Sequence, residues 1–234
     1  MSAAPAPRAR LVLFDIDGTL LSGGLAARSV FAAALTEVFG TCGDIDMFAF
    51  EGKLDPMIVR DLLVEAGVPE ETVLRRRAEA LAIYLDRLEA ALALERPVLK
   101  PGVAAVLDGV ARSAGALPAL LTGNVERGAR IKLSAVGLWD RFAFGAFGDE
   151  APRREELGPI ALAKARRLGF PFEGSDCVVV GDAPQDVACA LALGARIVAV
   201  ATGKTPAGRL ADAGAHVVLP DLSDTSRALE AILG

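Results

Sequence analysis

The stretch Phe14-Asp15-Ile16-Asp17-Gly18-Thr19-Leu20 continues a short apolar run, residues 11–14, and these residues together decide the fold class. An apolar run that ends at a carboxylate is typical of a buried strand in a parallel sheet. Asp15 and Asp17 stand two residues apart, so an extended segment places both side chains on the same side. With Asp, Gly and Thr each at roughly 5–7% of residues, the pattern D-x-D-G-T is expected by chance in about 0.2% of chains of this length. The pattern therefore indicates a functional site rather than ordinary turn residues.

The rest of the chain divides into two regions with different sequence patterns. From residue 97 onward, strand patterns alternate with helix patterns, whereas residues 22–96 carry only helix patterns. Alternation of this kind predicts a parallel sheet with right-handed crossovers. We therefore expect an α/β fold: a Rossmann-like parallel sheet flanked by helices, formed by residues 1–21 and 97–234. A small all-helical segment, residues 22–96 and called the insert below, interrupts this core after the first strand. The expected strands are residues 11–14, 117–121, 142–147, 177–180, 196–200 and 216–219, and the expected helices are residues 25–39, 55–66, 69–94, 101–113, 126–136, 155–168, 185–193, 205–213 and 223–233.

The bulk composition is that of an ordinary globular chain, with 53% hydrophobic and 24% charged residues among 234. The 25 Lys and Arg residues against 30 Asp and Glu residues give a formal net charge of −5, which argues against a general nucleic-acid binder. No apolar run is long enough to span a membrane, and residues 1–10 lack the apolar segment of a signal peptide. We therefore expect a frayed tail over residues 1–10, no membrane partner and a cytoplasmic protein. The oligomeric state is left open.

The cysteines and the histidine do not indicate a site of their own. Cys42, Cys177 and Cys189 form an odd set without a CxxC pair, which argues against a disulfide framework or a zinc site. The single histidine, His216, stands at the end of an expected strand, where we expect it to face solvent. A histidine-based mechanism is therefore disfavoured.

Polar residues also follow two later strands of the expected sheet. The second strand runs into Thr122-Gly123-Asn124, and the fourth runs into the segment 181–186. Ligands of open α/β sheets bind at the carboxyl ends of the strands, where these segments would meet. Such an arrangement would bring together four acids: Asp15, Asp17, Asp182 and Asp186. Carboxylates at close range repel one another unless a cation offsets their charge, and Mg²⁺ prefers oxygen ligands, so we expect a magnesium site. Taken singly, each acid has the alternative of being a turn residue or a helix cap.

These motifs resemble those of the haloacid dehalogenase superfamily of phosphohydrolases. Asp15-x-Asp17-Gly18-Thr19-Leu20 is similar to the first family motif, residues 120–124 to the second, and Gly181-Asp182-x-x-x-Asp186 to the fourth. The insert resembles the small helical cap of the phosphoglycolate phosphatase branch, and residues 52–56 are similar to a segment of that cap. The resemblance covers nearly the whole chain. It implies a magnesium-dependent phosphatase acting on a small phosphorylated metabolite, phosphoglycolate-like or a sugar phosphate, through an aspartyl-phosphate intermediate.

The third family motif is the one from which this chain departs. The family places a lysine before the helix that precedes the fourth strand, whereas this chain has Arg153 and Arg154 there, and Lys164 lies too far into the helix. An arginine binds phosphate well, so the role can survive the change. Arg154 is the first candidate to replace the lysine, and Arg153 is the second.

The resemblance implies different roles for the paired acids. Asp15 would be the nucleophile, ionised at neutral pH without help because a free aspartate has a pKa of about 3.9. Asp17 would protonate the leaving alkoxide and later activate water, with its pKa raised by neighbouring carboxylates.

The remaining implied roles concern the metal and the phosphate. Asp15, Asp182 and the backbone carbonyl of Asp17 would hold Mg²⁺, while Asp186 would orient water ligands or the cationic side chain. Arg154 would stabilise charge on the phosphoryl group. The residues expected to contact phosphate oxygens are Gly18, Thr122, Gly123, Asn124 and Arg154.

In the insert, Lys53, Asp55 and Arg60 are candidates to contact the leaving group; alternatively, they are the solvated charges of a helix start. Two other functions stay open, and a third is disfavoured. A phosphomutase of the same fold is the nearest alternative, and a non-catalytic phosphate-binding module is another. A carbon–halogen or carbon–phosphorus hydrolase is disfavoured, because those branches lack an acid at the position of Asp17.

Overall fold

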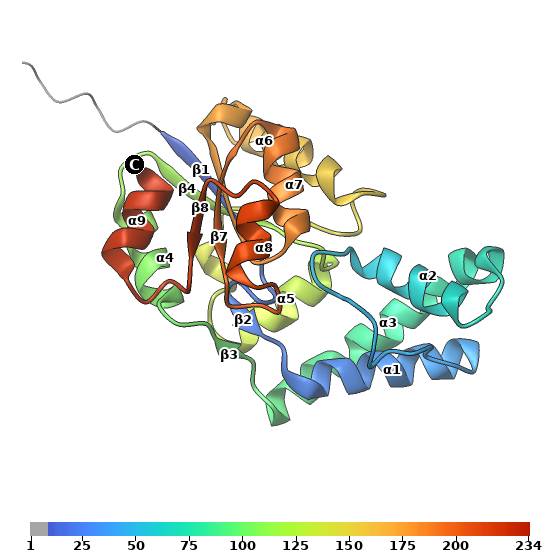
Figure 1. The fold of residues 1–234 in the computed structure, drawn as a ribbon. Helices are drawn as coiled ribbons and strands as arrows, with labels where there is room; N and C mark the ends of the chain where they lie inside the picture. Colours follow the sequence, from blue (N-terminus) through green and yellow to red (C-terminus); the bar gives the residue numbers. More distant parts are fainter. Residues whose placement is uncertain (1–8) are drawn as a thin grey trace, which may run out of the picture.

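The protein is described by a computed structural model, which covers residues 9–234. A six-stranded parallel sheet forms its centre, with the strand order β5-β4-β1-β6-β7-β8 (Figure 1). This confirms the expected α/β fold class. The strands are β1 (Arg10–Phe14), β4 (Ala116–Leu121), β5 (Gly145–Ala146), β6 (Cys177–Gly181), β7 (Arg196–Val200) and β8 (Val217–Leu219).

Strand β1 lies in the middle of the sheet, between β4 and β6. Leu11 pairs with Leu117 on one side and with Cys177 on the other. Its apolar residues are buried on both faces, as expected for a strand covered by helices on both sides. The register carries the residue after β1, Asp15, to the same sheet edge as the residues after β4 and β6.

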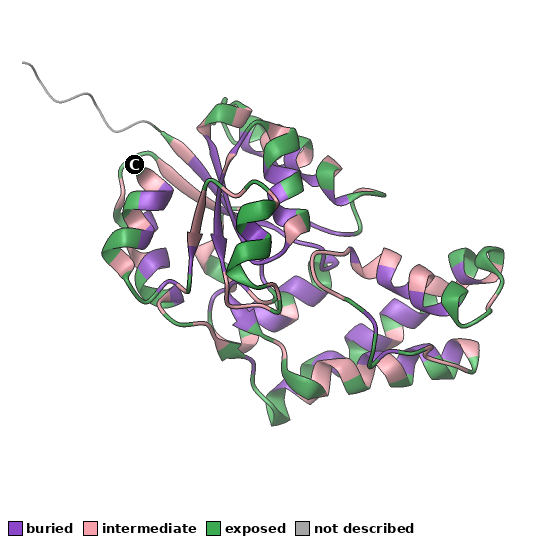
Figure 2. Ribbon diagram, viewed as in Figure 1, coloured by how far each residue is buried: buried purple, intermediate pink, exposed green. Residues whose placement is uncertain are grey.

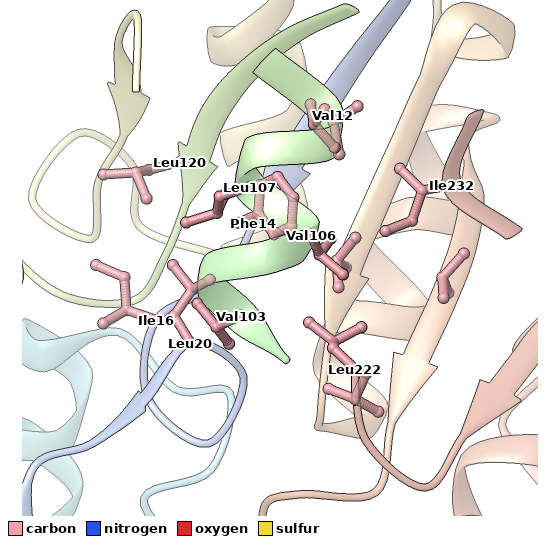
Figure 3. Packing of buried hydrophobic residues seen from close by; sticks show 14 of the residues in the cluster. Val12, Phe14, Ile16, Leu20, Val103, Val106, Leu107, Leu120, Leu222 and Ile232 are labelled. Atoms are coloured by element: carbon pink, nitrogen blue, oxygen red, sulfur yellow. The ribbon is translucent and has the colours of Figure 1, made fainter. Parts of the chain in front are cut away.

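Each face of the sheet has its own helical layer, because successive side chains of a strand point to opposite faces. Val12 and Phe14 belong to the cluster under α4 (Val103–Arg112), α5 (Glu126–Ala135) and α9 (Thr225–Leu233). Figure 3 shows α4 lying over this face, with Val103, Val106 and Leu107 against it. Leu11 and Leu13 belong to the opposite cluster, under three other helices. These are α6 (Leu157–Arg167), α7 (Pro184–Leu193) and α8 (Ala207–Asp212).

The insert forms a separate helical group at one end of the sheet (Figure 1). Its helices are α1 (Gly24–Phe39), α2 (Asp55–Glu65) and α3 (Glu70–Leu94), close to the expected bounds. They bury a third hydrophobic cluster that also includes Val125, next to α5. Figure 2 shows the buried residues of α3 on the side that faces its neighbours. The insert therefore has an apolar interior and packs on the core through α5.

The chain leaves and re-enters the core through two short strands that the sequence did not predict. These are β2 (Leu21–Ser22) and β3 (Val98–Leu99), each of two residues, paired antiparallel. Strands of this length are too short to show a periodic pattern.

Other differences from the expected elements are small. Strand β5 is only two residues long rather than six. The chain just before it still bonds to β4: the Ala143 N–H donates to the Pro118 carbonyl, and the Leu120 N–H donates to the Phe144 carbonyl. Helix α6 begins at Leu157, after a 3₁₀ turn over Arg154–Glu156, and Pro159 fits its first turn because the first helical N–H groups need no partner. His216 is exposed, as expected, although its Nδ1 accepts a hydrogen bond from the Ile197 N–H.

The expected tail over residues 1–10 falls largely outside the described part of the chain, which begins at residue 9. Arg10 itself belongs to β1, so that end of the expected tail was wrong. Within residues 9–234, no helix is both long enough and apolar enough to cross a membrane.

Candidate active site

The carboxyl ends of β1, β4 and β6 meet at one edge of the sheet, where the candidate residues lie together. Asp15, Asp182 and Asp186 each offer a carboxylate oxygen, and these oxygens lie within 4.8 Å of one another. All three residues are buried. We call this group the acid cluster. Among the residues of the described chain, the Asp17 carboxylate does not join it.

Burial changes the protonation of the acid cluster. It is the largest cause that raises the pKa of Asp15 to about 7; the charge of Asp186 adds to the increase, and Arg154 opposes it. Burial also raises the pKa of Asp182 to about 8, together with the charges of Asp15 and Asp186. The expectation that Asp15 ionises at neutral pH without help was therefore wrong for the protein alone, because a buried carboxylate loses its hydration.

Arg154 is the cation that contacts the acid cluster. Its Nη2 atom donates a hydrogen bond of 3.0 Å to Asp15 Oδ1 and another to Asp186 Oδ1. Burial alone lowers the pKa of Arg154, but the charges of Asp186 and Asp15 outweigh it, so the pKa is raised. Arg153, the second candidate, is exposed and pairs with Glu156. Lys164 bonds to Glu150 and to the Gly145 carbonyl instead.

Asp186 fixes the loop between β6 and α7. Its Oδ2 accepts hydrogen bonds from the backbone N–H groups of Asp182, at 3.1 Å, and Ala183, at 3.0 Å. Its Oδ1 faces Arg154. Asp186 therefore holds both the loop that carries Asp182 and the arginine.

Asp17 has different neighbours from those expected. Its Oδ2 accepts hydrogen bonds from Lys132 Nζ at 2.6 Å and from Asn124 Nδ2 at 2.7 Å. The Asp17 side chain is 43% exposed, whereas that of Lys132 is only 8% exposed. Burial by itself lowers the pKa of Lys132, but the charge of Asp17 and its hydrogen bond raise it well above its ordinary range. A cation, rather than a carboxylate, is thus the closest charged partner of Asp17.

The residues expected to bind phosphate lie around the acid cluster. Thr122 is buried, and its Oγ1 accepts a hydrogen bond of 3.0 Å from Asn124 Nδ2. Gly18 has a φ of +89°, and a Cβ there would lie 2.3 Å from Asp182 Oδ2, so only glycine fits. Gly123 faces the insert: a Cβ there would lie 1.9 Å from the Lys53 carbonyl oxygen.

A cavity of about 380 Å³ opens between the core and the insert, above Asp15 and Asp17. Of the three candidates in the insert, Lys53 and Asp55 line the cavity. Arg60 does not line it and pairs with Glu70 and Asp61 instead. The insert also supplies apolar walls and a cation, Arg28, and the core supplies further cations. These lining residues are Arg28, Phe31, Phe50, Ile58, Tyr84, Lys100, Lys132 and Lys204.

The insert touches the rim of the cavity through specific bonds. Asp55 Oδ2 accepts a hydrogen bond of 2.9 Å from the Val125 N–H, and the Asp55 N–H donates to the Gly123 carbonyl at 2.8 Å. Glu51 pairs with Lys204 at 2.9 Å. Burial raises the pKa of Asp55 to about 6, although Lys132 and the Val125 N–H oppose the increase.

Sequence reasoning missed Lys132 and two residues that follow β7 near the acid cluster, Thr202 and Gly203. Lys132 follows Ala129 by three residues on the buried face of α5, and this position on an apolar stripe was the available signal. Thr202 Oγ1 donates a hydrogen bond of 2.6 Å to the Gly18 carbonyl, and a Cβ at Gly203 would collide with Asp182. No motif marks Thr202 or Gly203, because they follow β7, whose end carries no acid.

The acid cluster has the composition of a site for a hard cation. The cluster holds three buried carboxylates and one arginine, which contacts only Asp15 and Asp186. Two of the three acids have raised pKa values, so the cluster lacks positive charge. Glycines at 18 and 203 close around Asp182. Carboxylate oxygens in a tight space suit a divalent metal ion. The cluster is therefore able to bind a metal.

Comparison with known proteins agrees with this geometry. The family model described as haloacid dehalogenase-like hydrolase matches residues 12–191, which is most of the chain and includes all of the acid cluster. The chain belongs to this hydrolase family. A second, related hydrolase model matches residues 158–225.

Individual relatives of this hydrolase point the same way. A phosphoglycolate phosphatase of Pseudomonas fluorescens is 29% identical over 222 residues, covering 93% of this chain and 79% of the relative. A phosphoglycolate phosphatase of Xylella fastidiosa is 31% identical over 195 residues, covering 79% and 77%. Among solved structures, a predicted phosphatase from Clostridium acetobutylicum has a TM-score of 0.73 at 21% identity, covering 95% of this chain and 99% of that one. That structure supports the fold.

Proposed function

We propose that this hydrolase is a phosphatase that releases inorganic phosphate from a small phosphorylated metabolite. The observation that carries the proposal is the contact between Asp15 and Arg154 at the floor of the cavity. A nucleophilic carboxylate and a fixed cation stand side by side there, as the transfer of an anionic phosphoryl group requires. The names of the relatives, phosphoglycolate phosphatases, support the same reaction class.

In the proposed reaction, a carboxylate oxygen of Asp15 forms a bond to phosphorus while the bond from phosphorus to the leaving oxygen breaks. Asp17 gives its proton to that oxygen. A water molecule then attacks the aspartyl phosphate, gives a proton to Asp17, and phosphate leaves Asp15. Arg154 stabilises the charge of the phosphoryl oxygens in both steps.

We propose Mg²⁺ as the cofactor, held by Asp15 and Asp182, with Asp186 beside it. When bound, a divalent ion neutralises charge on the phosphoryl oxygens and favours the ionised form of neighbouring acids. This matters for Asp15, the proposed nucleophile, because its raised pKa of about 7 otherwise leaves much of it protonated at neutral pH. Asp182 is the acid that makes no bond to Arg154, which supports its role as a metal ligand.

We also propose that residues 22–96 act as a lid over the site. Asp55 and Glu51 attach the insert to the core at the rim, and the aromatic side chains of Phe31, Phe50 and Tyr84 exclude water from the cavity. The cavity of about 380 Å³ lies at the small end of ligand pockets, which supports a metabolite of phosphoglycolate or sugar-phosphate size. The three cysteines are free, which supports a cytoplasmic location.

The experiment is phosphate release from a panel of phosphorylated metabolites, including phosphoglycolate and sugar phosphates, with MgCl₂ and with EDTA. We expect release with MgCl₂ and its loss in D15N. D212N, which changes an exposed acid at the end of α8, is the control. Full activity in D15N would refute the mechanism. Isomer formation from a sugar phosphate without phosphate release would identify a phosphomutase instead.

A further inference from the structure

Lys132 is a buried lysine at the site to which the sequence motifs assign no role. It lies on the inner face of α5, and its Nζ atom donates hydrogen bonds to Asp17 Oδ2 and to Asn124 Oδ1, both at 2.6 Å. A lysine is rarely buried unless it is paired. Its burial and its two bonds therefore distinguish Lys132 from a solvated lysine of the protein surface.

Asn124 completes a clamp on one oxygen of Asp17. Its Nδ2 atom donates to Asp17 Oδ2 at 2.7 Å and to Thr122 Oγ1 at 3.0 Å. Oδ2 thus receives two hydrogen bonds from donors that are themselves fixed, one on α5 and one at the end of β4.

The other oxygen of Asp17 has a different environment. Within residues 9–234, no hydrogen bond reaches Asp17 Oδ1. A Cβ at Gly23, another residue of the cavity wall, would lie 3.6 Å from it. Oδ1 is therefore the Asp17 oxygen that is available to a substrate or to water.

We propose that Lys132 is the positioning residue of Asp17: with Asn124 it holds Oδ2, so that Oδ1 is the oxygen that transfers the proton. This inference rests on the proposed phosphatase function and adds to it. In the first step, the proton leaves Asp17 Oδ1 for the leaving oxygen as the phosphorus–oxygen bond breaks. In the second, the attacking water returns a proton to Oδ1 as the bond from phosphorus to Asp15 breaks.

The role predicts a dependence on the leaving group. An alkoxide needs the proton as it leaves, whereas nitrophenolate is a weak base and leaves without it. Loss of Lys132 should therefore slow phosphorylation by an alkyl phosphate but spare phosphorylation by 4-nitrophenyl phosphate. Hydrolysis of the aspartyl phosphate, in which Asp17 acts as a base, should be slowed for both substrates.

The test compares K132M with the wild type on phosphoglycolate and on 4-nitrophenyl phosphate. We expect kcat/KM for phosphoglycolate to fall by about 100-fold, within the range of general acid catalysis, and that for the aryl ester by less than about threefold. For the aryl ester, kcat and KM should fall together, because the second step becomes rate-limiting. Equal falls of kcat/KM for the two substrates would overturn the inference, as would an unchanged enzyme.

Three further variants make the comparison specific. K132R keeps the charge and should restore part of the activity on phosphoglycolate. If K132M does not fold, N124A carries the same comparison, because it removes the other donor to Oδ2. K164M is the matched control: Lys164 is also partly buried and bonded to an acid, Glu150, but it does not line the cavity. In K164M, kcat/KM should change by the same small factor for both substrates.

The result also separates this inference from the proposed function. A wild type that releases no phosphate from 4-nitrophenyl phosphate or from any metabolite of the panel refutes the phosphatase. A wild type that is active, together with a K132M variant whose substrate preference is unchanged, refutes only the role of Lys132.

Discussion

Arg154 Nη2 lies 3.0 Å from Asp15 Oδ1, and the same nitrogen also contacts Asp186. One nitrogen of the guanidinium therefore serves both acids, as a lysine ammonium does. Arg154 Nε is buried and has no hydrogen-bond partner among the described residues. The extra donors of arginine are thus not all used here.

This geometry predicts that R154K is a mild substitution and R154M a severe one. Lysine supplies a single cationic nitrogen and removes the unpaired Nε, so we expect kcat/KM to fall less than about tenfold. Methionine removes the charge, and the expected loss is about 100-fold or more. R153M changes an exposed residue and should match the wild type. Steady-state kinetics of the three variants check this, and equal losses in R154M and R153M would contradict it.

The acid cluster predicts how stability depends on pH in EDTA. Aspartate starts from a pKa of 3.8, whereas Asp15 and Asp182 reach about 7 and about 8 in the folded protein. Between pH 3.8 and about 8, the folded state therefore binds more protons than the unfolded chain. The free energy of unfolding falls as the pH rises across this interval. Urea unfolding at a series of pH values measures the slope.

D182N is the informative variant for this slope. It removes one of the two raised groups, so the free energy of unfolding should fall less steeply with pH than in the wild type. D212N should keep the wild-type slope. A wild-type protein whose stability rises over this interval would show that the acids are not desolvated as described.

The same cluster predicts stabilisation by Mg²⁺. An ion that binds only the folded state at about 100 times its Kd adds about 2.7 kcal/mol, a rise of roughly 5–10 °C in Tm for a chain of this size. The shift should be largest near pH 8, where Asp15 and Asp182 are more ionised. Differential scanning calorimetry with MgCl₂ or EDTA measures it. An equal rise of Tm with MgCl₂ in D182N would show that the ion binds elsewhere.

The close contact between Gly123 and the insert predicts that the position of the insert on the core matters for catalysis. An alanine there would place a Cβ 1.9 Å from the Lys53 carbonyl oxygen, so the segment that carries Asp55 must move. We expect G123A to lose about 100-fold in kcat/KM with an unchanged circular dichroism spectrum, because small displacements of a site are costly. G208A, on α8 with no neighbour within 4 Å of the added carbon, is the matched control and should keep full activity.

The sheet was predictable from the sequence because its strands are short apolar runs whose ends carry acids and glycines. β1, β6 and β7 agree with the expected residues to within one or two positions. β5 was overestimated because only Gly145 and Ala146 form the regular ladder with β4, although Ala143 and Phe144 also make backbone hydrogen bonds to that strand. The signal for burial and the signal for a strand are the same in such a run.

The candidate site was predictable only where residues follow strands. Asp15, Asp182 and Arg154 meet because the strand order brings their segments together. Lys132 was missed because a lysine in a helix is ordinarily solvated, and its role depends on the insert that covers it. Arg60 was wrongly expected in the cavity because no pattern in α2 shows how the insert is rotated on the core.

The ladder of β2 and β3 has a further consequence. Leu21 pairs with Leu99 and Ser22 with Val98, so the chain leaves the core and returns to it at adjacent positions. Topologically, the whole insert is the loop of a hairpin. The entropy lost in closing a loop grows only with the logarithm of its length, so lengthening or shortening this loop costs the sheet little. New recognition surfaces can therefore evolve on the insert while the catalytic sheet stays as it is.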